Sequence, residues 1–248
     1  MGTFVVLFDI DGTLLHGSAE THVRAFADAL AAVTGYPDPF VWMDDGIFCG
    51  GESLSGRIDA EIVRMCLRHA GLAEADVARH APVMMEETVQ AYRARVAVGE
   101  PAGTTVPGVV AVLHELRDRG VVCGLLTGNA RQIASAKLSA CGLDPYFQLG
   151  GFGDEGSRRS QLFAGALAEA TALGIDRPEV CYVGDTPLDV VAARIAGVPL
   201  VAVATGRFDQ LALQHAGAAF VLPGYDPTTT VCDVLIDHAR SIVSGGQR

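Results

Sequence analysis

Two aspartates, one residue apart, follow an apolar stretch near the N-terminus, and they are the residues best placed to do chemistry. Residues 4–8 are all apolar, and Asp9, Asp11 and Gly12 come directly after them. In a strand, residues i and i+2 point to the same side, so both carboxylates can enter one crevice. Because two close carboxylates repel each other, the pattern predicts a bound cation such as Mg²⁺ or a shared proton.

The same residue types also occur in surface turns and in calcium-binding loops. An EF-hand loop would continue with oxygen ligands at alternate positions, whereas Leu14 and Leu15 follow here. The apolar stretch in front of Asp9 favours a buried strand that ends in a functional site.

A second apolar stretch, residues 121–126, ends in Thr127, Gly128 and Asn129, and a helical pattern begins at Arg131. A helix N-terminus has free N–H groups, and a hydroxyl beside them makes a site for an anion. This segment is therefore a candidate phosphate-binding loop.

A third segment runs from a strand pattern at 180–184 into Asp185 and then into a helical pattern that carries Asp189. Between the second and third segments, Arg158 and Arg159 begin an amphipathic segment and offer a fixed positive charge. Either arginine could also be a solvated charge at a helix start.

In order and separation, these motifs resemble those of the haloacid dehalogenase superfamily, in particular its helical-cap phosphatases of the phosphoglycolate phosphatase and phosphomutase type. The resemblance covers nearly the whole chain. Its motifs correspond to Asp9–Thr13, to the strand that ends at Thr127, and to the segment from Gly184 to Asp189.

The chain departs from the family pattern at the third motif, where most relatives have a lysine. Its single lysine, Lys137, lies in the middle of the helical pattern after Thr127. Some relatives carry an arginine instead, and Arg159 fits that variant, with Arg158 as the alternative if the register differs by one residue.

The resemblance implies a mechanism with an aspartyl-phosphate intermediate. Asp9 would be the nucleophile, and Asp11 the general acid and base. Mg²⁺ would be held by Asp9, the main-chain carbonyl of Asp11, and Asp185, with Asp189 orienting groups behind them. The groups expected to hold the phosphoryl oxygens are Thr127, Gly128, Asn129 and Arg159.

Alternating strand and helix patterns predict an α/β fold, with a Rossmann-like, doubly wound parallel sheet. Strands are expected at about 3–9, 121–127, 180–184, 199–204 and 219–222. Residues 17–100 show helical faces at 22–34, 58–70 and 76–96 and no confident strand. We therefore expect a core domain of 1–16 and 101–248, with 17–100 inserted after the first strand as a helical cap and hinges near 15–20 and 97–106.

Arg57 and His16 are candidates for substrate specificity. Arg57 follows a Ser-Gly pair in the expected cap and could reach a distal carboxylate of the substrate, or it could be an ordinary surface residue at a helix start. His16, just after the first motif, could contact the substrate or be structural. The large apolar side chains expected in the cap core are Phe40, Trp42, Met43, Met84 and Met85, with an alternative position for Trp42 at the entrance to the site.

Other activities of the superfamily fit the residues less well. Dehalogenases lack the second aspartate, which is present here as Asp11. Phosphonoacetaldehyde hydrolases need a cap lysine, which the expected cap does not contain. A phosphomutase of the β-phosphoglucomutase type uses the same core residues and stays open, although such enzymes usually rely on a cap lysine. A non-catalytic phosphate-binding protein is the alternative of another class.

Composition and charge indicate which kinds of partner the protein can bind. The net charge of −11 argues against nucleic acid and requires a local cation at a phosphate site. No apolar run reaches the ~18 residues of a membrane span. The six cysteines show no zinc spacing and indicate reduced, buried thiols. We expect a cytoplasmic enzyme acting on a small phosphorylated metabolite, and the sequence does not indicate an oligomeric state.

Overall fold

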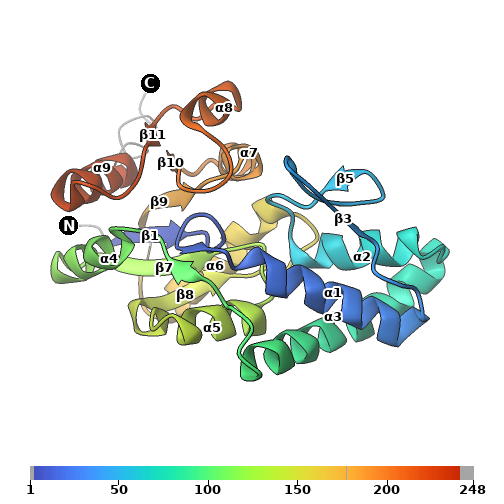
Figure 1. Cartoon of the computed structure of the whole chain (residues 1–248). Helices are drawn as coiled ribbons and strands as arrows, with labels where there is room; N and C mark the ends of the chain where they lie inside the picture. Colours follow the sequence, from blue (N-terminus) through green and yellow to red (C-terminus); the bar gives the residue numbers. More distant parts are fainter. Residues whose placement is uncertain (1–2, 177, 241–248) are drawn as a thin grey trace.

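The computed structural model describes residues 3–176 and 178–240, which form a parallel sheet covered by helices and a mainly helical insertion (Figure 1). Within these residues, the main sheet has the strand order β11-β10-β9-β1-β7-β8, with every pair parallel. Its strands are β1 (Phe4–Phe8), β7 (Val122–Leu126), β8 (Phe147–Gly151), β9 (Glu179–Gly184), β10 (Leu200–Val203) and β11 (Val221–Leu222). The predicted fold class is confirmed.

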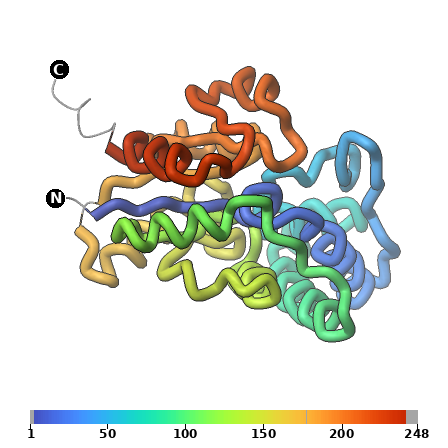
Figure 2. The backbone as a smooth tube through the Cα atoms, turned by 60° about the vertical axis from the view of Figure 1, so that its left-hand side comes forward, coloured from blue at the N-terminus to red at the C-terminus, as the bar shows by residue number. Residues whose placement is uncertain are grey.

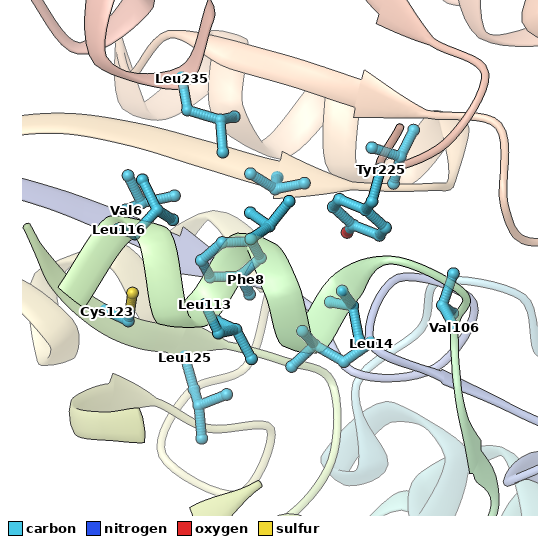
Figure 3. Packing of buried hydrophobic residues seen from close by; sticks show 14 of the residues in the cluster. Val6, Phe8, Leu14, Val106, Leu113, Leu116, Cys123, Leu125, Tyr225 and Leu235 are labelled. Atoms are coloured by element: carbon cyan, nitrogen blue, oxygen red, sulfur yellow. The ribbon is translucent and has the colours of Figure 1, made fainter. Parts of the chain in front are cut away.

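Side chains of β1 alternate between two hydrophobic layers, one on each face of the sheet. Val6 and Phe8 pack in a cluster with residues of α4 (Val109–Asp118) and α9 (Thr228–Arg240), as Figure 3 shows. Val5 and Leu7 pack with residues of α6 (Leu162–Ala172) and α7 (Pro187–Ala196). Because both faces of β1 are buried, its sequence is a continuous apolar run.

The remaining elements outside the insertion are short or lie near the sheet edges. These are α5 (Arg131–Ala140), α8 (Gln210–His215), and the 3₁₀ turns η1 (Asp144–Tyr146) and η2 (Arg159–Gln161). Of the main-sheet strands, only β8 falls outside the predicted ranges. Its sequence, FQLGG, ends in two glycines, which weaken any strand signal.

Residues 17–100, which we call the insertion, contain three long helices around their own hydrophobic cluster. The helices are α1 (Ala19–Thr34), α2 (Asp59–His69) and α3 (Glu74–Ala97), close to the three predicted faces. The buried members of the cluster lie between Val23 and Met84. In Figures 1 and 2 the insertion projects from one end of the sheet.

The prediction of an insertion without strands was incomplete. A small antiparallel sheet is formed by β3 (Phe40–Met43), β4 (Gly46–Cys49) and β5 (Glu52–Ser53). Phe40 and Met84 are buried as predicted, but Trp42 and Met43 are 48% and 58% exposed. The assignment of these two residues to the core was wrong, because edge strand β3 buries Phe40 at its start and leaves the following side chains exposed. Trp42 is not among the residues that line the cavity.

The two chain crossings between sheet and insertion lie side by side. Strand β2 (Leu15–His16) pairs antiparallel with β6 (Thr104–Thr105), and the hydroxyl of Thr21 donates to the carbonyl of Pro101 at 2.8 Å. The predicted hinge segments therefore form one narrow connection. Within the described ranges, no helix combines the length and the apolar character needed to cross a membrane.

Candidate active site

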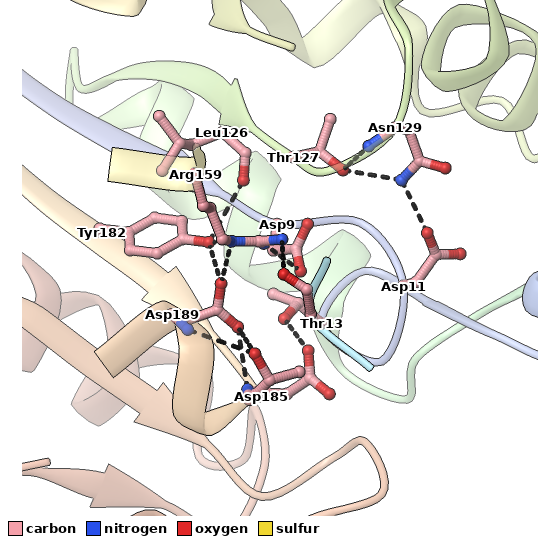
Figure 4. A network of polar contacts seen from close by, with 12 residues as sticks. Asp9, Asp11, Thr13, Leu126, Thr127, Asn129, Arg159, Tyr182, Asp185 and Asp189 are labelled. Atoms are coloured by element: carbon pink, nitrogen blue, oxygen red, sulfur yellow. Dashed lines mark hydrogen bonds and ion pairs between the residues drawn. The ribbon is translucent and has the colours of Figure 1, made fainter. Parts of the chain in front are cut away.

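Asp9 lies at the carboxyl end of the central strand β1 and is 4% exposed. Its backbone N–H donates to the carbonyl of Val183 in β9 at 2.9 Å, which continues the ladder to the point where the carboxylate emerges. The neighbouring strands β7 and β9 lead to Thr127 and Asp185. The three predicted strand-end motifs therefore meet at one edge of the sheet, as Figure 4 shows.

Arg159 connects the strand-end carboxylates. Its guanidinium lies 2.7 Å from Asp9 Oδ2 and 2.6 Å from Asp189 Oδ1, and it donates to the hydroxyl of Tyr182 at 2.9 Å. Arg159 is 7% exposed, whereas Arg158 is exposed to solvent. Of the two candidate arginines, Arg159 is the one that contacts Asp9.

Asp9, Asp185 and Asp189 form a buried acidic cluster, with one oxygen of each within 4.8 Å of the others. Asp189 is held by the hydroxyl of Tyr182 at 2.5 Å and by the N–H and hydroxyl of Thr186, which caps α7. Because these donors and Arg159 occupy Asp189, Asp9 and Asp185 are the carboxylates left with free lone pairs.

Asp185 lies in a tight backbone cradle. It accepts from the hydroxyl of Thr13 at 2.9 Å, and a Cβ added at Gly12 or Gly206 would collide with its carboxylate. Gly12 also has a φ of +84°, which favours glycine. The turn after the first motif therefore requires glycine both for its backbone conformation and for the approach of Asp185.

The pKa values reflect the crowding of negative charge. Burial, aided by Asp189 and Asp11 and opposed by Arg159, raises the pKa of Asp9 to about 7. Burial and the same kind of repulsion raise the pKa of Asp185 well above its usual range. The carboxylate oxygens of Asp9 and Asp185 are the kind of ligand that a divalent cation such as Mg²⁺ prefers. A bound cation would relieve the repulsion between them.

Asp11 faces a different set of partners. Figure 4 shows its carboxylate turned toward Asn129, whose amide donates to Oδ2 at 2.7 Å. The ammonium of Lys137 lies 2.6 and 2.8 Å from the two oxygens, and Ser18 donates to Oδ1. Burial alone would raise the pKa of Asp11, but Lys137 and His22 hold it well below its usual range.

The candidate phosphate loop joins β7 to the start of α5. The hydroxyl of Thr127 accepts from the backbone N–H and the amide of Asn129, and both residues are buried. The carboxylate of Asp59, at the start of α2, accepts from the N–H of Ala130 at 2.7 Å. The insertion therefore supplies the side chain that caps α5.

A cavity of about 440 Å³ opens above these groups, between the sheet edge and the insertion. Asp9, Asp11, Gly128, Asn129, Arg159 and Asp185 line one part of it, and the insertion residues Val23, Phe26, Ile47, Leu54 and Ile62 line another. Both specificity candidates, Arg57 and His16, also line the cavity. Arg57 donates to Glu52 and to the carbonyl of Ser53, and His16 contacts the carbonyl of Thr205 at 2.7 Å.

Sequence reasoning missed the positions of Lys137, Arg207 and Tyr182. Arg207 lines the cavity from the loop after β10 and reaches toward β4, with a long 3.5 Å contact to the carbonyl of Asp44. No motif indicated Arg207 or Tyr182. Lys137 did carry a signal, because the only lysine of the chain occurs on the helix that follows the phosphate loop.

The fold and the site define an α/β enzyme with an acidic centre at the strand ends and an insertion above it. A family model for haloacid dehalogenase-like hydrolases matches residues 5–197, and an HAD-hydrolase-like model matches residues 159–237. The chain therefore belongs to the haloacid dehalogenase-like hydrolases.

The chain is similar to curated phosphatases over most of its length. It is 30% identical to the phosphoglycolate phosphatase of Rhodospirillum rubrum, over 81% of this chain and 79% of that protein. It is 32% identical to the phosphoglycolate phosphatase of Synechococcus elongatus, over 85% of this chain and 88% of that protein. The prediction of a hydrolase of the phosphatase class is confirmed.

Among solved structures, the fold is similar to CbbY from Rhodobacter sphaeroides, determined in complex with phosphate. The TM-score is 0.63 and the sequence identity 24%, and the match covers 91% of this chain and 96% of that one. At this identity the similarity supports the fold alone.

Proposed function

We propose that the protein is a Mg²⁺-dependent phosphomonoesterase that acts through an aspartyl-phosphate on a small phosphorylated metabolite such as phosphoglycolate. The observation that carries the proposal is the position of Asp9, buried at a strand end between Arg159 and Asp185 and lining the cavity. Nucleophile, countercharge and candidate metal ligands meet there.

In the first step, Asp9 attacks phosphorus, the bond to the leaving oxygen breaks, and Asp11 protonates that oxygen. In the second step, Asp11 takes a proton from a water molecule, which attacks phosphorus and releases Asp9. The low pKa of Asp11, caused by Lys137 and His22, favours the carboxylate form that the second step requires. When bound, Mg²⁺ would offset the repulsion between Asp9 and the phosphate dianion.

The other site residues would hold the substrate during both steps. Thr127, Arg159 and the N–H groups of Gly128 and Asn129 would bind the phosphoryl oxygens. Asp9, Asp185 and the main-chain carbonyl of Asp11 would hold the metal ion, with Asp189 fixing Arg159 from behind. The insertion, residues 17–100, would act as a cap that excludes water from the cavity.

The cavity favours a small anionic substrate. Its volume of about 440 Å³ suits a metabolite, and Arg57 and Arg207 approach it from opposite parts of the chain. Either guanidinium could bind a distal carboxylate, which supports phosphoglycolate among the phosphomonoesters. The curated relatives named as phosphoglycolate phosphatases support the same substrate.

A panel of phosphomonoesters assayed with Mg²⁺ or with chelator tests the proposal, with Asp9→Asn as the control. We expect Mg²⁺-dependent phosphate release, highest on phosphoglycolate or a similarly small carboxylated ester, and none from the folded Asp9→Asn variant. Equal turnover with chelator, or survival of activity in Asp9→Asn, would contradict the mechanism. Isomerisation of a sugar phosphate without net phosphate release would favour the phosphomutase alternative. If no compound is turned over, the result would favour the non-catalytic phosphate-binding protein.

A further inference from the structure

Lys137 is the only lysine in the chain, and its side chain is completely buried on α5. Helical side chains point back toward the helix N-terminus, which here follows the phosphate loop. Its ammonium therefore reaches Asp11 and Asn129 from beneath the loop. A buried charge of this kind is costly unless it is paired and hydrogen-bonded, which directs attention to its partners.

The three N–H donors of Lys137 match three oxygens. Two belong to Asp11, at 2.6 and 2.8 Å, and the third is Asn129 Oδ1 at 2.7 Å. The amide of Asn129 in turn donates to Asp11 Oδ2. Lys137 and Asn129 thus donate to both oxygens of the Asp11 carboxylate, which restricts its orientation.

The opposite side of Asp11 is open. Its side chain is 32% exposed, and the residue lines the cavity, while Lys137 behind it is 0% exposed. An acid–base group needs this arrangement, because it must be fixed from behind and accessible to the substrate in front. Lys137 itself does not line the cavity, so its effect on the reaction would pass through its two partners that do, Asp11 and Asn129.

The insertion also contacts this group. His22 of α1 lies 3.3 Å from the ammonium of Lys137 through Nδ1 and 3.2 Å from Asp59 through Nε2. The ring of His22 stacks on Phe26 at 4.8 Å. Lys137 is therefore enclosed from the cap side as well, which restricts the ammonium to one position.

We propose that Lys137 is a positioning residue that orients the carboxylate of Asp11 for proton transfer, and that this contact, rather than the one with Asn129, makes most of its contribution to the reaction. This inference rests on the proposed phosphatase function. It distinguishes Lys137 from Arg159, which contacts the nucleophile Asp9.

A double-mutant cycle of Lys137→Met and Asp11→Asn tests the inference, with phosphate release as the measurement. We expect Lys137→Met to lower kcat by about 10²-fold, within the range of general acid–base catalysis. In the Asp11→Asn background, the same change should alter kcat less than about threefold, because the group that Lys137 orients has been replaced.

Ile133→Val serves as a control on the same helix, since Ile133 is buried but does not contact Asp11. It should lower the melting temperature slightly and leave kcat unchanged in both backgrounds. If Lys137→Met does not fold, Lys137→Gln replaces it in the cycle, because its neutral amide is hydrogen-bonded more easily in a buried site but lacks the charge and the third donor of the ammonium. Its loss of kcat should be smaller than that of Lys137→Met and should again shrink in the Asp11→Asn background.

An equal loss of kcat in both backgrounds would overturn the inference and reduce Lys137 to a structural residue. An unchanged kcat in the single variant would overturn it too. The failure of the proposed function looks different, since the unmodified chain would then release no phosphate, and the inference would fall with it.

Discussion

Arg159 pairs with two carboxylates, one at the end of a strand and one on a helix, and so connects two elements of the site. It contacts Asp9 after β1 and Asp189 on α7, and it is itself almost inaccessible to solvent. A buried ion pair of this kind is a weak source of stability but is costly to break, because the remaining charges have no counterion.

Replacing Arg159 by Met should therefore destabilise the protein by about 3–5 kcal/mol and abolish phosphate release. Arg158→Met is the matched control, since the neighbouring arginine is exposed, and it should change stability by less than about 0.5 kcal/mol. Urea unfolding and phosphate release measure the two effects. If both variants lose the same stability and activity, Arg159 does not have the structural role described here.

At the scale of elements, α5 links the phosphate loop to the insertion. Asp59 accepts from the N–H of Ala130, and the backbone N–H of Asp59 donates to the carbonyl of Gly128 at 2.8 Å. The start of α2 and the start of α5 thus complete each other's hydrogen bonds. The N-cap residue of α5, Ala130, makes no side-chain cap hydrogen bond, and in α2 Glu61 accepts only a long bond of 3.5 Å from the N–H of Ile58.

Asp59→Ala should lower stability by about 1–2 kcal/mol and raise KM, because the phosphate loop loses the bond that fixes the start of α5. Asp59→Asn retains an oxygen acceptor and should recover most of the stability. Thermal unfolding and steady-state kinetics separate the two variants. An Asp59→Ala variant as stable as the unmodified protein would contradict this account.

The sequence predicted the elements that carry periodic or continuous apolar patterns, including β1, β7, β9 and the long helices. It could not predict β8, whose glycines hide the strand, or the exposed sheet that contains Trp42. Strand-end positions of Asp9, Thr127 and Asp185 followed from local spacing. Lys137 reaches Asp11, and Arg207 reaches the cavity, through the tertiary fold, which local spacing does not encode.

At the scale of the whole molecule, a chain with a net negative charge also has buried carboxylates clustered in its candidate active site. The net charge of −11 adds to the repulsion among the buried carboxylates, and the pKa of Asp9 is raised to about 7. A group with a raised pKa contributes stability that is present below its unfolded value and lost as the pH rises through the folded value. For Asp9 the stability is lost between the usual carboxyl pKa of 3.8 and the raised pKa of about 7.

The metal-free protein should therefore lose melting temperature as the pH rises through about 7, and Mg²⁺ should restore it most strongly at the alkaline end. At a concentration one hundred times Kd, the ion would stabilise the protein by about 2.7 kcal/mol. Melting curves with chelator or Mg²⁺ across this pH range measure the effect. Asp9→Asn should flatten the pH dependence and reduce the shift caused by Mg²⁺; a full shift in that variant would exclude Asp9 as a ligand.

The burial of the only lysine has a practical consequence for labelling the protein. An amine-reactive reagent added to the folded chain meets no exposed lysine side chain, since Lys137 is 0% exposed. Covalent tagging of Lys137 would then occur only when α1 and the loop before α5 move apart. The labelling rate of Lys137, measured by peptide mass spectrometry, would therefore report how often this part of the site opens, without any engineered probe.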